Sequence, residues 1–591
     1  MRFQEDFEVL LMDAGKVLLN QIFSKRLLEI PFYQRAYVWK EEQWERLLSD
    51  MEFITDTQRP YFMGSVILKQ GEAPKVWENF SDRKIVVDGQ QRLTTLLILL
   101  RVLALKTKKV KSFDSDFRLG NDSDDDDDDT PGRIALAHGK NDADAFNLVM
   151  NHKVAEKIDN EKNSQIIAAF NYFVSNLNPE KIAKNTIMSC IQFVCIDLAA
   201  DENEQQVFDT INSLGVNLTT AELLKNYFFN KDNIKDYITY WQDIFELNDD
   251  TREYWETEIE VGKKKRMLLD LFFDSYFQII LNDDKFEVKA EDKKYYSRDD
   301  RIAQSYQDFI KKYCNGDKQK VISGISDYAK TFRDWFNPAF CQQSMSYSSH
   351  KHRINVIIFG LKNSTLIPYI LYAAQNITDT HELNAIIDVL ESYIMRRLVM
   401  HVSNKNYNRL FTSLILNNTL TASSLKNHLS GSQDATTFMP SDADLREGFH
   451  KSKLSNLHAK GIIYFIESYQ RSAKSSTGIL CFNLYSLEHL MPKKWRNEWS
   501  YPSTEEERRI RDSVLLTLGN LAIITQPLNS AIRDSKWDDK KNGKNSAKGL
   551  AAYASGLFTM DDVLKESDWD ESKINARADS LCNIAEKIWK I

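Results

Sequence analysis

Four polar residues near the end of the chain carry side chains suited to metal-assisted hydrolysis. Glu488 and His489 are adjacent, and Asn520 and Asn529 follow them. A histidine with a pKa near neutrality can deprotonate water when a hydrogen-bond acceptor fixes its tautomer. A divalent cation held by carboxylate and amide oxygens stabilises charge on a phosphate. We assign His489 as the base, Asn520 as its orienting residue, Glu488 and Asn529 as ligands of Mg²⁺ or Mn²⁺, and Asp534 as a spare ligand.

The local sequence predicts two strands and a short helix around these residues. Residues 482–489 alternate as in a strand, and Pro492 ends the run. Residues 518–521 indicate a hairpin turn into a second strand over 521–524, and Asn529 opens a short helix. A hairpin with these positions for His and the two Asn is similar to the site of an HNH (ββα-metal) nuclease. The alternative for a lone Glu-His pair is a core histidine.

A second polar group lies between a predicted buried strand at Ile85–Val87 and a helix whose apolar spacing begins at Leu93. Free amides and the dipole of a helix N-terminus favour an anion, and a guanidinium can bind phosphate through two hydrogen bonds. The sequence therefore predicts a phosphate site, although helix capping alone is the other interpretation. The residues are Asp88, Gly89, Gln90, Gln91 and Arg92.

Tyr33, Gln34 and Arg35 stand among aromatic residues in a segment predicted to be extended after Pro31, before a helix that begins near Lys40. Aromatic rings supply stacking surface, and Arg and Gln supply directed hydrogen bonds, so such a mixture often lines a site. The alternative is an edge strand with Arg35 in solvent.

Composition excludes few classes of protein. A chain of 591 residues exceeds one ordinary core, and its net charge of −8 argues against a wholly basic binder. Residues 493–548 nevertheless hold twelve Lys or Arg and eight Asp or Glu, which suits a phosphate-binding surface. The six cysteines show no metal-ligand spacing, and no leader or membrane span is evident. We expect a cytoplasmic protein without membrane contact.

The pattern of residue types along the chain predicts three parts. Residues 1–230 alternate strands and helices, including strand candidates at 61–68 and 190–198, as in an α/β or α+β domain. Residues 231–440 form an α-helical linker domain with aromatic stripes, and 441–591 hold the Glu488 and His489 group. The acidic run at 121–130 indicates a solvated loop, or less strongly an electrostatic shield of a basic groove.

Several motifs occur together in an order that resembles the GmrSD family of modification-dependent (type IV) restriction enzymes, which includes SspE-like and BREX-associated members. The motifs are IPFYQRAYVW, GSVIL, VVDGQQRLTTL, VFDTINSLGVNLTTAELLKNYFF, EHLMP, LGNLAIIT and LNS. The resemblance implies a multidomain chain, mainly α with α/β parts. Its parts would be a ParB/sulfiredoxin-like N-terminal domain, a helical middle region and a C-terminal HNH nuclease embedded in helices. It also implies hydrolysis of a nucleoside triphosphate, commonly GTP, and cleavage of modified phage DNA.

By the same resemblance, Asp88, Gln90, Gln91 and Arg92 form the nucleotide site, with Tyr33, Gln34 and Arg35 close by and Asn212 and Lys225 closing the pocket. Trp537 stands where the family usually has Phe. We expect an NTP-regulated endonuclease acting on double-stranded DNA, in which nucleotide controls His489. The alternatives are a nucleotide-switched DNA-binding regulator with a degenerate nuclease domain, and an HNH toxin indifferent to modification. The modification, the preferred nucleotide and a homodimeric assembly are left open.

Overall fold

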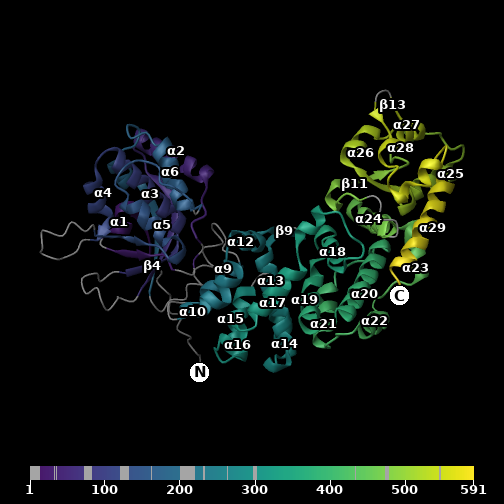
Figure 1. Ribbon diagram of the computed structural model, residues 1–591, viewed down its shortest axis with the longest axis horizontal. Helices are drawn as coiled ribbons and strands as arrows, with labels where there is room; N and C mark the ends of the chain where they lie inside the picture. The colour runs from purple at the N-terminus through teal and green to yellow at the C-terminus, as the bar shows by residue number, and fades with distance from the viewer. Residues whose placement is uncertain are drawn as a thin grey trace, which may run out of the picture. The chain divides into compact units, whose positions relative to one another are not determined.

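The computed structural model (Figure 1) describes residues 13–591 except 25, 32–33, 35, 72–82, 120–131, 162, 200–219, 230–232, 263, 297–301, 433, 435, 473–477 and 545–546. The chain divides into two compact units, Met1–Tyr237 and Ile238–Ile591. It is mainly helical with a small mixed sheet, which confirms the predicted multidomain class. The predicted boundaries at 230 and 440 stay predictions. Within the described part of the chain, no helix combines the length and apolar character that a membrane crossing requires.

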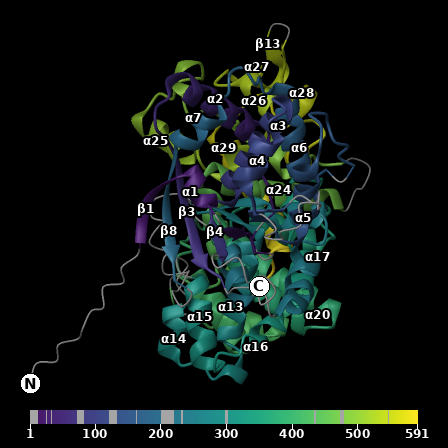
Figure 2. The same cartoon turned by 90° about the vertical axis from the view of Figure 1, so that its left-hand side faces the viewer.

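Six strands of the first unit form one mixed sheet. They are β1 (Asp13–Leu18), β2 (Leu27–Glu29), β3 (Tyr61–Gln70), β4 (Arg83–Asp88), β7 (Leu136–Ala137) and β8 (Ile191–Leu198). Their order is β1–β8–β3–β4–β2–β7, and Figure 2 shows four of them side by side. β1 with β8 and β3 with β4 are antiparallel, whereas β3 with β8 and β2 with both of its neighbours are parallel. The β4 strand, which leads into the predicted phosphate site, therefore lies inside the sheet.

Helices cover one face of this sheet (Figure 1). The period-2 alternation of β3 sends Val66 and Leu68 into the main core and Ile67 into a smaller cluster with Val87 on the opposite face. α3 is buried from Leu93 to Leu105, as expected for a helix that is apolar all round. The helices of the first unit are α1 (Leu19–Phe23), α2 (Glu41–Thr57), α3 (Gln90–Lys106), α4 (Val110–Phe117), α5 (Lys140–Asn151), α6 (Gln165–Asn176), α7 (Lys184–Cys190), α9 (Thr220–Phe228) and α10 (Ile234–Tyr237), and the last two contribute no residue to this core.

The predictions for the first unit are mostly confirmed. β3, β4, β8 and the start of α2 lie where the sequence indicates them, apart from Cys190, which ends α7. The strand predicted between Pro31 and α2 is wrong at residues 36–40, which belong to no strand. Side chains satisfy the backbone there: the Tyr37 amide donates to Asp142 at 2.7 Å, and the Val38 amide donates to Gln91 at 3.0 Å. The acidic run lies outside the described residues.

The second unit begins with helices and one small hairpin, β9 (Glu258–Val261) with β10 (Lys264–Met267). Its core is aromatic, as predicted: Trp241 stacks on Phe273 with ring centroids 5.4 Å apart. Lys264 and Lys265 are exposed, as in a solvated face. The principal helices are α12 (Asp249–Glu256), α13 (Leu268–Leu281), α15 (Ile302–Tyr313), α17 (Ile325–Trp335), α19 (Ile367–Asn376), α20 (Thr380–Val399), α21 (Tyr407–Leu416), α22 (Ala422–Ser430) and α23 (Asp442–Lys451).

The last 140 residues of the same unit build a strand pair held between helices. β11 (Tyr485–His489) and β12 (Leu521–Thr525) pair antiparallel, and α24 (Asn456–Ser472) packs against both strands. α25 (Glu505–Val514) lies between the strands in sequence, and α26 (Gln526–Ile532) and α27 (Trp537–Asn542) follow β12. The final helix, α29 (Glu571–Ile588), packs on residues 518–520. This arrangement fixes the strand end at which His489 lies.

Candidate functional site

His489 is the last residue of β11, opposite Leu521 at the start of β12. The predicted strand pair and helix exist, but residues 490–520 join the strands in place of a tight hairpin turn. Three local predictions are therefore wrong. Residues 482–484 form a 3₁₀ turn before β11, and residues 518–520 form a 3₁₀ turn before β12. α26 starts at Gln526, so Asn529 lies within the helix and does not open it.

Asn520 is a buried brace for the backbone that follows His489. Its side chain donates to the carbonyls of Met491 at 2.8 Å and Leu515 at 2.9 Å, and its oxygen accepts from the amide of Met491 at 2.8 Å. The oxygen also accepts from the Trp569 indole at 3.1 Å. These bonds occupy the amide group, so the predicted direct orientation of the His489 ring is wrong. Asn520 instead positions the segment that leaves the histidine.

Close packing of α29 explains why Gly519 precedes this asparagine. A Cβ atom at Gly519 would overlap the backbone carbonyl of Ile574. The buried guanidinium of Arg577 donates to the carbonyls of Gly519 at 2.8 Å and Leu521 at 2.7 Å. Burial lowers the pKa of Arg577 to about 10, so it stays charged at neutral pH. The turn before β12 is thus fixed from the last helix of the chain.

Glu488 is buried and paired with Lys540, a residue of α27 that the sequence prediction missed. The Lys540 ammonium contacts Glu488 Oε1 and donates to the His489 carbonyl at 2.7 Å. Its side chain is 0% exposed. Burial raises the pKa of Glu488 and lowers that of Lys540, because each ion loses water, while their attraction opposes both changes. One ammonium therefore holds both residues of the Glu-His dipeptide.

The His489 ring is half-buried at the end of β11. Burial, followed by the charges of Lys493 and Lys540, lowers the pKa of His489 to about 4. The imidazole is therefore neutral at pH 7 and has a nitrogen lone pair that can accept a proton. A low pKa also makes it a weak base, so a nearby negative phosphate would raise its basicity.

Asn529 approaches β11 from α26. Its amide nitrogen donates to the Leu487 carbonyl at 2.9 Å and to the Ser486 hydroxyl at 3.1 Å, which leaves the amide oxygen for other partners. Asp534 is exposed, and its charge acts on Glu488 and Lys540. Among the described residues, no three His, Cys, Asp or Glu gather as a metal site. One carboxylate oxygen and one amide oxygen still suit Mg²⁺, which keeps waters and binds substrate phosphate.

The predicted phosphate site lies where β4 meets α3. Asp88 ends the strand, and Gly89 adopts φ +101 before Gln90 begins the helix. A Cβ at Gly89 would press against Val66 of the neighbouring strand, so glycine serves both the turn and the close approach. The first amides of α3 face the end of β4, as the predicted anion site requires.

Two of the predicted ligand-binding glutamines hold the protein together. Gln91 accepts from the Val38 amide at 3.0 Å and donates to the Ala36 carbonyl at 3.2 Å. Gln34 donates to the carbonyls of Val86 at 2.6 Å and Val87 at 3.0 Å. Both amide groups therefore tie the segment before α2 to the strand and helix of the phosphate site.

Arg92 is engaged by Asp88 of its own turn. The guanidinium donates to Asp88 at 3.0 Å and to the Met63 carbonyl at 3.2 Å. Gly64 leaves room for it, because a Cβ there would overlap the guanidinium. Gln90 is half-buried, and Lys225 of α9 is buried. Tyr33, Arg35 and Asn212 lie outside the described residues.

Sequence distance explains why Lys540 was missed. It lies 52 residues beyond Glu488, and no local pattern marks it among the neighbouring lysines. The sequence held only one indirect signal. Lys540 follows Asn529, the last asparagine of the predicted site, and lies in a short helix that the fold places beside Glu488 and His489. Only the folded structure shows which of the lysines is buried.

Two family models match the chain. The N-terminal domain of GmrSD restriction endonucleases matches residues 17–229, and their C-terminal domain matches residues 439–584. The class is thus that of a DNA endonuclease with a restriction role. The chain belongs to the GmrSD restriction endonuclease family. A comparison with curated proteins found no match.

Proposed function

We propose that this chain is a metal-dependent DNA endonuclease of anti-phage defence, regulated by a nucleoside triphosphate and directed at modified DNA. The observation that carries the proposal is the His489 site. A neutral histidine ends β11 directly after a buried carboxylate, and Lys540 fixes both residues. Such an arrangement can place a proton acceptor and a metal ligand side by side at a phosphodiester.

In the proposed reaction, His489 accepts a proton from a water molecule as that water attacks phosphorus. The bond from phosphorus to one ester oxygen breaks, and that oxygen leaves and takes up a proton from solvent. Lys540 contacts Oε1 of Glu488, and the backbone of His489 also hydrogen-bonds to this carboxylate, so a cation would share the group with both partners. Glu488 and the Asn529 oxygen would hold Mg²⁺ or Mn²⁺, which supplies charge stabilisation at the scissile phosphate. Asn520 and Arg577 keep the strand-pair end at which His489 lies in place. We assign an HNH (ββα-metal) architecture to this part on the order β11, β12, α26.

The nucleotide site is proposed at the N-terminus of α3, in a ParB/sulfiredoxin-like domain. Its support is the Arg92 side chain beside the first helical amides, with 22% of that side chain exposed. Triphosphate, most simply GTP, would compete with Asp88 for the guanidinium. Gln91 and Gln34 act on the same site by fixing its walls. We place this activity in the cytoplasm, where six free cysteines such as these remain reduced.

The decisive experiment is plasmid nicking by His489→Ala. The variant should lose at least 100-fold in rate in Mg²⁺ or Mn²⁺, because general-base catalysis contributes about 10²–10⁴-fold. The control is His450→Ala, a half-buried histidine of α23 that pairs with Asp579. Unchanged nicking by His489→Ala would refute the assignment. DNA binding by the wild-type chain without cutting in any divalent metal would favour the regulatory alternative.

Substrate choice is tested by matched DNAs. Unmodified, hydroxymethylated, glucosylated and phosphorothioate plasmids are incubated with the wild-type chain, with and without GTP. The proposal expects faster cutting of at least one modified DNA and a dependence on nucleotide. Equal cutting of all four DNAs, indifferent to GTP, would instead indicate the toxin alternative.

A further inference from the structure

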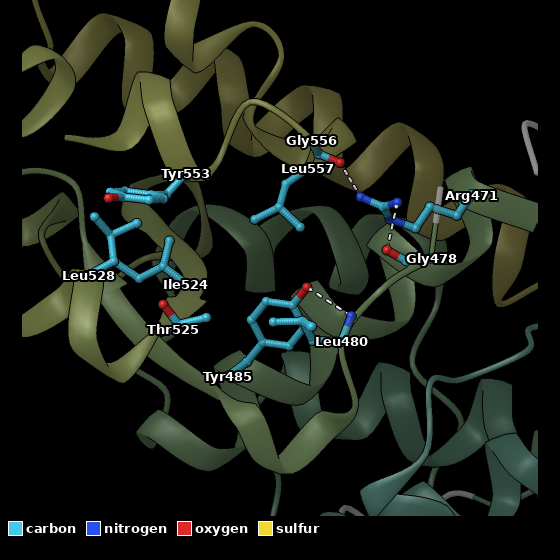
Figure 3. Close-up of a pocket in the computed structure, with 10 residues that line it drawn as sticks. All are labelled: Arg471, Gly478, Leu480, Tyr485, Ile524, Thr525, Leu528, Tyr553, Gly556 and Leu557. Carbon is cyan, nitrogen blue, oxygen red and sulfur yellow. Dashed lines mark hydrogen bonds between the residues drawn. The ribbon is translucent and has the colours of Figure 1, made fainter. Parts of the chain in front are cut away.

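A cavity of about 190 Å³ opens at the end of the strand pair opposite His489 (Figure 3). β11 contributes Tyr485 to its wall, and the start of α26 contributes Leu528. Leu557 closes it from the segment after α28 (Leu550–Tyr553), and Tyr553 lies at the mouth with 65% of its surface exposed. The wall combines aromatic and aliphatic side chains with the guanidinium of Arg471, which bonds to the carbonyls of Gly478 and Gly556, and it is built from segments far apart in sequence.

The volume and the polarity of the cavity suit a ligand with one flat ring. An engineered apolar cavity of about 150 Å³ holds a benzene molecule, so this cavity has room for a single-ring ligand. Thr525 precedes α26, yet its hydroxyl does not cap that helix. The Tyr485 hydroxyl accepts from the Leu480 amide at 3.3 Å, which leaves its own proton to donate. The cavity therefore offers two hydroxyl groups beside apolar side chains, with Arg471 held by backbone carbonyls, a combination that recognises a heterocycle with polar edges.

The position of the cavity brings DNA to it. Tyr485 and Thr525 are paired across the strands, four residues from His489, or roughly 13 Å at about 3.3 Å per residue. The short hairpin of β13 (Gly543–Lys544) and β14 (Ala547–Lys548) leads directly into α28. Its Lys544 and Lys548 are exposed next to Tyr553 in sequence, where phosphates of a bound strand would meet them.

We propose that this cavity receives one pyrimidine base extruded from the DNA duplex near the cleavage site. The inference rests on the proposed function, because it takes DNA at His489 as its starting point. Tyr553 would stack on the extruded base, and Thr525 and Tyr485 would bond its edge. An enzyme that extrudes a base must supply the free energy that unpairs and unstacks it, and this free energy is smallest for a mismatched base. Base recognition would then lie in the nuclease part, apart from the nucleotide site.

The test measures binding of two 30-base-pair duplexes, one matched and one with a central pyrimidine mismatch, to the full chain carrying His489→Ala. The parent should bind the mismatched duplex about tenfold more tightly. Adding Tyr553→Ala should abolish that preference, because one base–aromatic stack is worth about tenfold or more in affinity. Leu557→Phe, which fills the cavity, should abolish it as well. Tyr501→Ala is the matched control, since this tyrosine is 58% exposed and lies outside the cavity.

Three outcomes would overturn the proposal. They are no mismatch preference in the parent, a preference retained by both cavity variants, or a preference lost equally with Tyr501→Ala. Because the assay reads binding, it is independent of cutting. Failure of the nicking experiment would refute the endonuclease mechanism and leave the binding preference measurable, whereas normal nicking without a preference would refute the cavity alone.

Discussion

The two candidate sites are built in opposite ways. At Glu488 and His489 the polar groups are held by residues from distant segments, including Lys540 and Asn520, and Glu488, Lys540 and Asn520 are buried. At the N-terminus of α3 the central contact is local, between Arg92 and Asp88 four residues apart, and 42% of the Asp88 side chain is exposed. The nuclease site is therefore preorganised. At the phosphate site, a ligand can replace Asp88 as the partner of Arg92 at a small cost in free energy.

This difference gives the two sites different roles in the proposed enzyme. A buried pair is costly to break, because removal of one partner leaves an uncompensated charge. An exposed pair at i and i+4 contributes only about 0.3–0.5 kcal/mol, so an anion readily displaces the carboxylate. The exchangeable site suits a sensor of nucleotide, and the fixed site suits catalysis. Mutations at the two sites should therefore differ in their effect on protein stability as well as in their effect on activity.

Lys540→Met should have the largest effect on both stability and activity. It leaves Glu488 buried without its counter-ion, which costs about 3–5 kcal/mol, reduced to the extent that the carboxyl takes up a proton. Loss of a group that orients a metal ligand costs about 10–100-fold in metal affinity or activity. We expect a lower melting temperature, weaker Mn²⁺ binding by calorimetry, and slower nicking.

Two controls sharpen that result. Lys541→Met removes the neighbouring lysine, whose ammonium donates to the Glu566 carbonyl at 2.8 Å, and should change little. Glu488→Gln with Lys540→Met replaces the ion pair by neutral groups, so it should recover stability but remain inactive. If Lys540→Met behaved like Lys541→Met, the fixed character of this site would be disproved.

Arg92→Ala should change stability little and lower the affinity for GTP strongly. Its effect on stability should stay below about 1 kcal/mol, because an exposed ion pair is lost. A charged hydrogen bond to phosphate is worth about 1.5–3 kcal/mol, so GTP affinity should fall by roughly 10–100-fold. Titration with labelled GTP and nicking across GTP concentrations would measure both.

The exposed Arg46 of α2 provides a matched control through Arg46→Ala. It should bind GTP as the wild type does. An Arg92→Ala protein that melted several degrees lower while cutting DNA with unchanged GTP dependence would reverse the comparison, because the α3 site would then be structural and not a sensor.

Sequence reasoning found the local features of both sites and missed their tertiary supports. The strand, glycine turn and helix of 85–100 follow from β-branched residues, one glycine and apolar spacing, all within sixteen residues. The Asn520 bond to Met491 spans 29 residues, and the Gln91 bond to Val38 spans 53. Residue types alone indicated that Gln91 faces a ligand and that Asn520 orients His489. Only the fold shows that their hydrogen bonds are used by the protein's own backbone.

Trp537→Phe should have the smallest effect and tests how far the fixed site extends. Trp537 begins α27, which carries Lys540, and its ring stacks on Trp569 with centroids 5.4 Å apart. The indole donates to the Glu566 carbonyl at 3.3 Å, a long bond whose loss costs about 0.5–1.5 kcal/mol. Phenylalanine keeps an aromatic face against Trp569, so α27 should keep its place. The melting temperature should fall by a few degrees at most, and nicking should stay within about twofold of wild type. A tenfold loss of nicking would show that Lys540 is set by the exact packing of this ring, and the fixed site would then extend to the layer formed by Trp537 and Trp569.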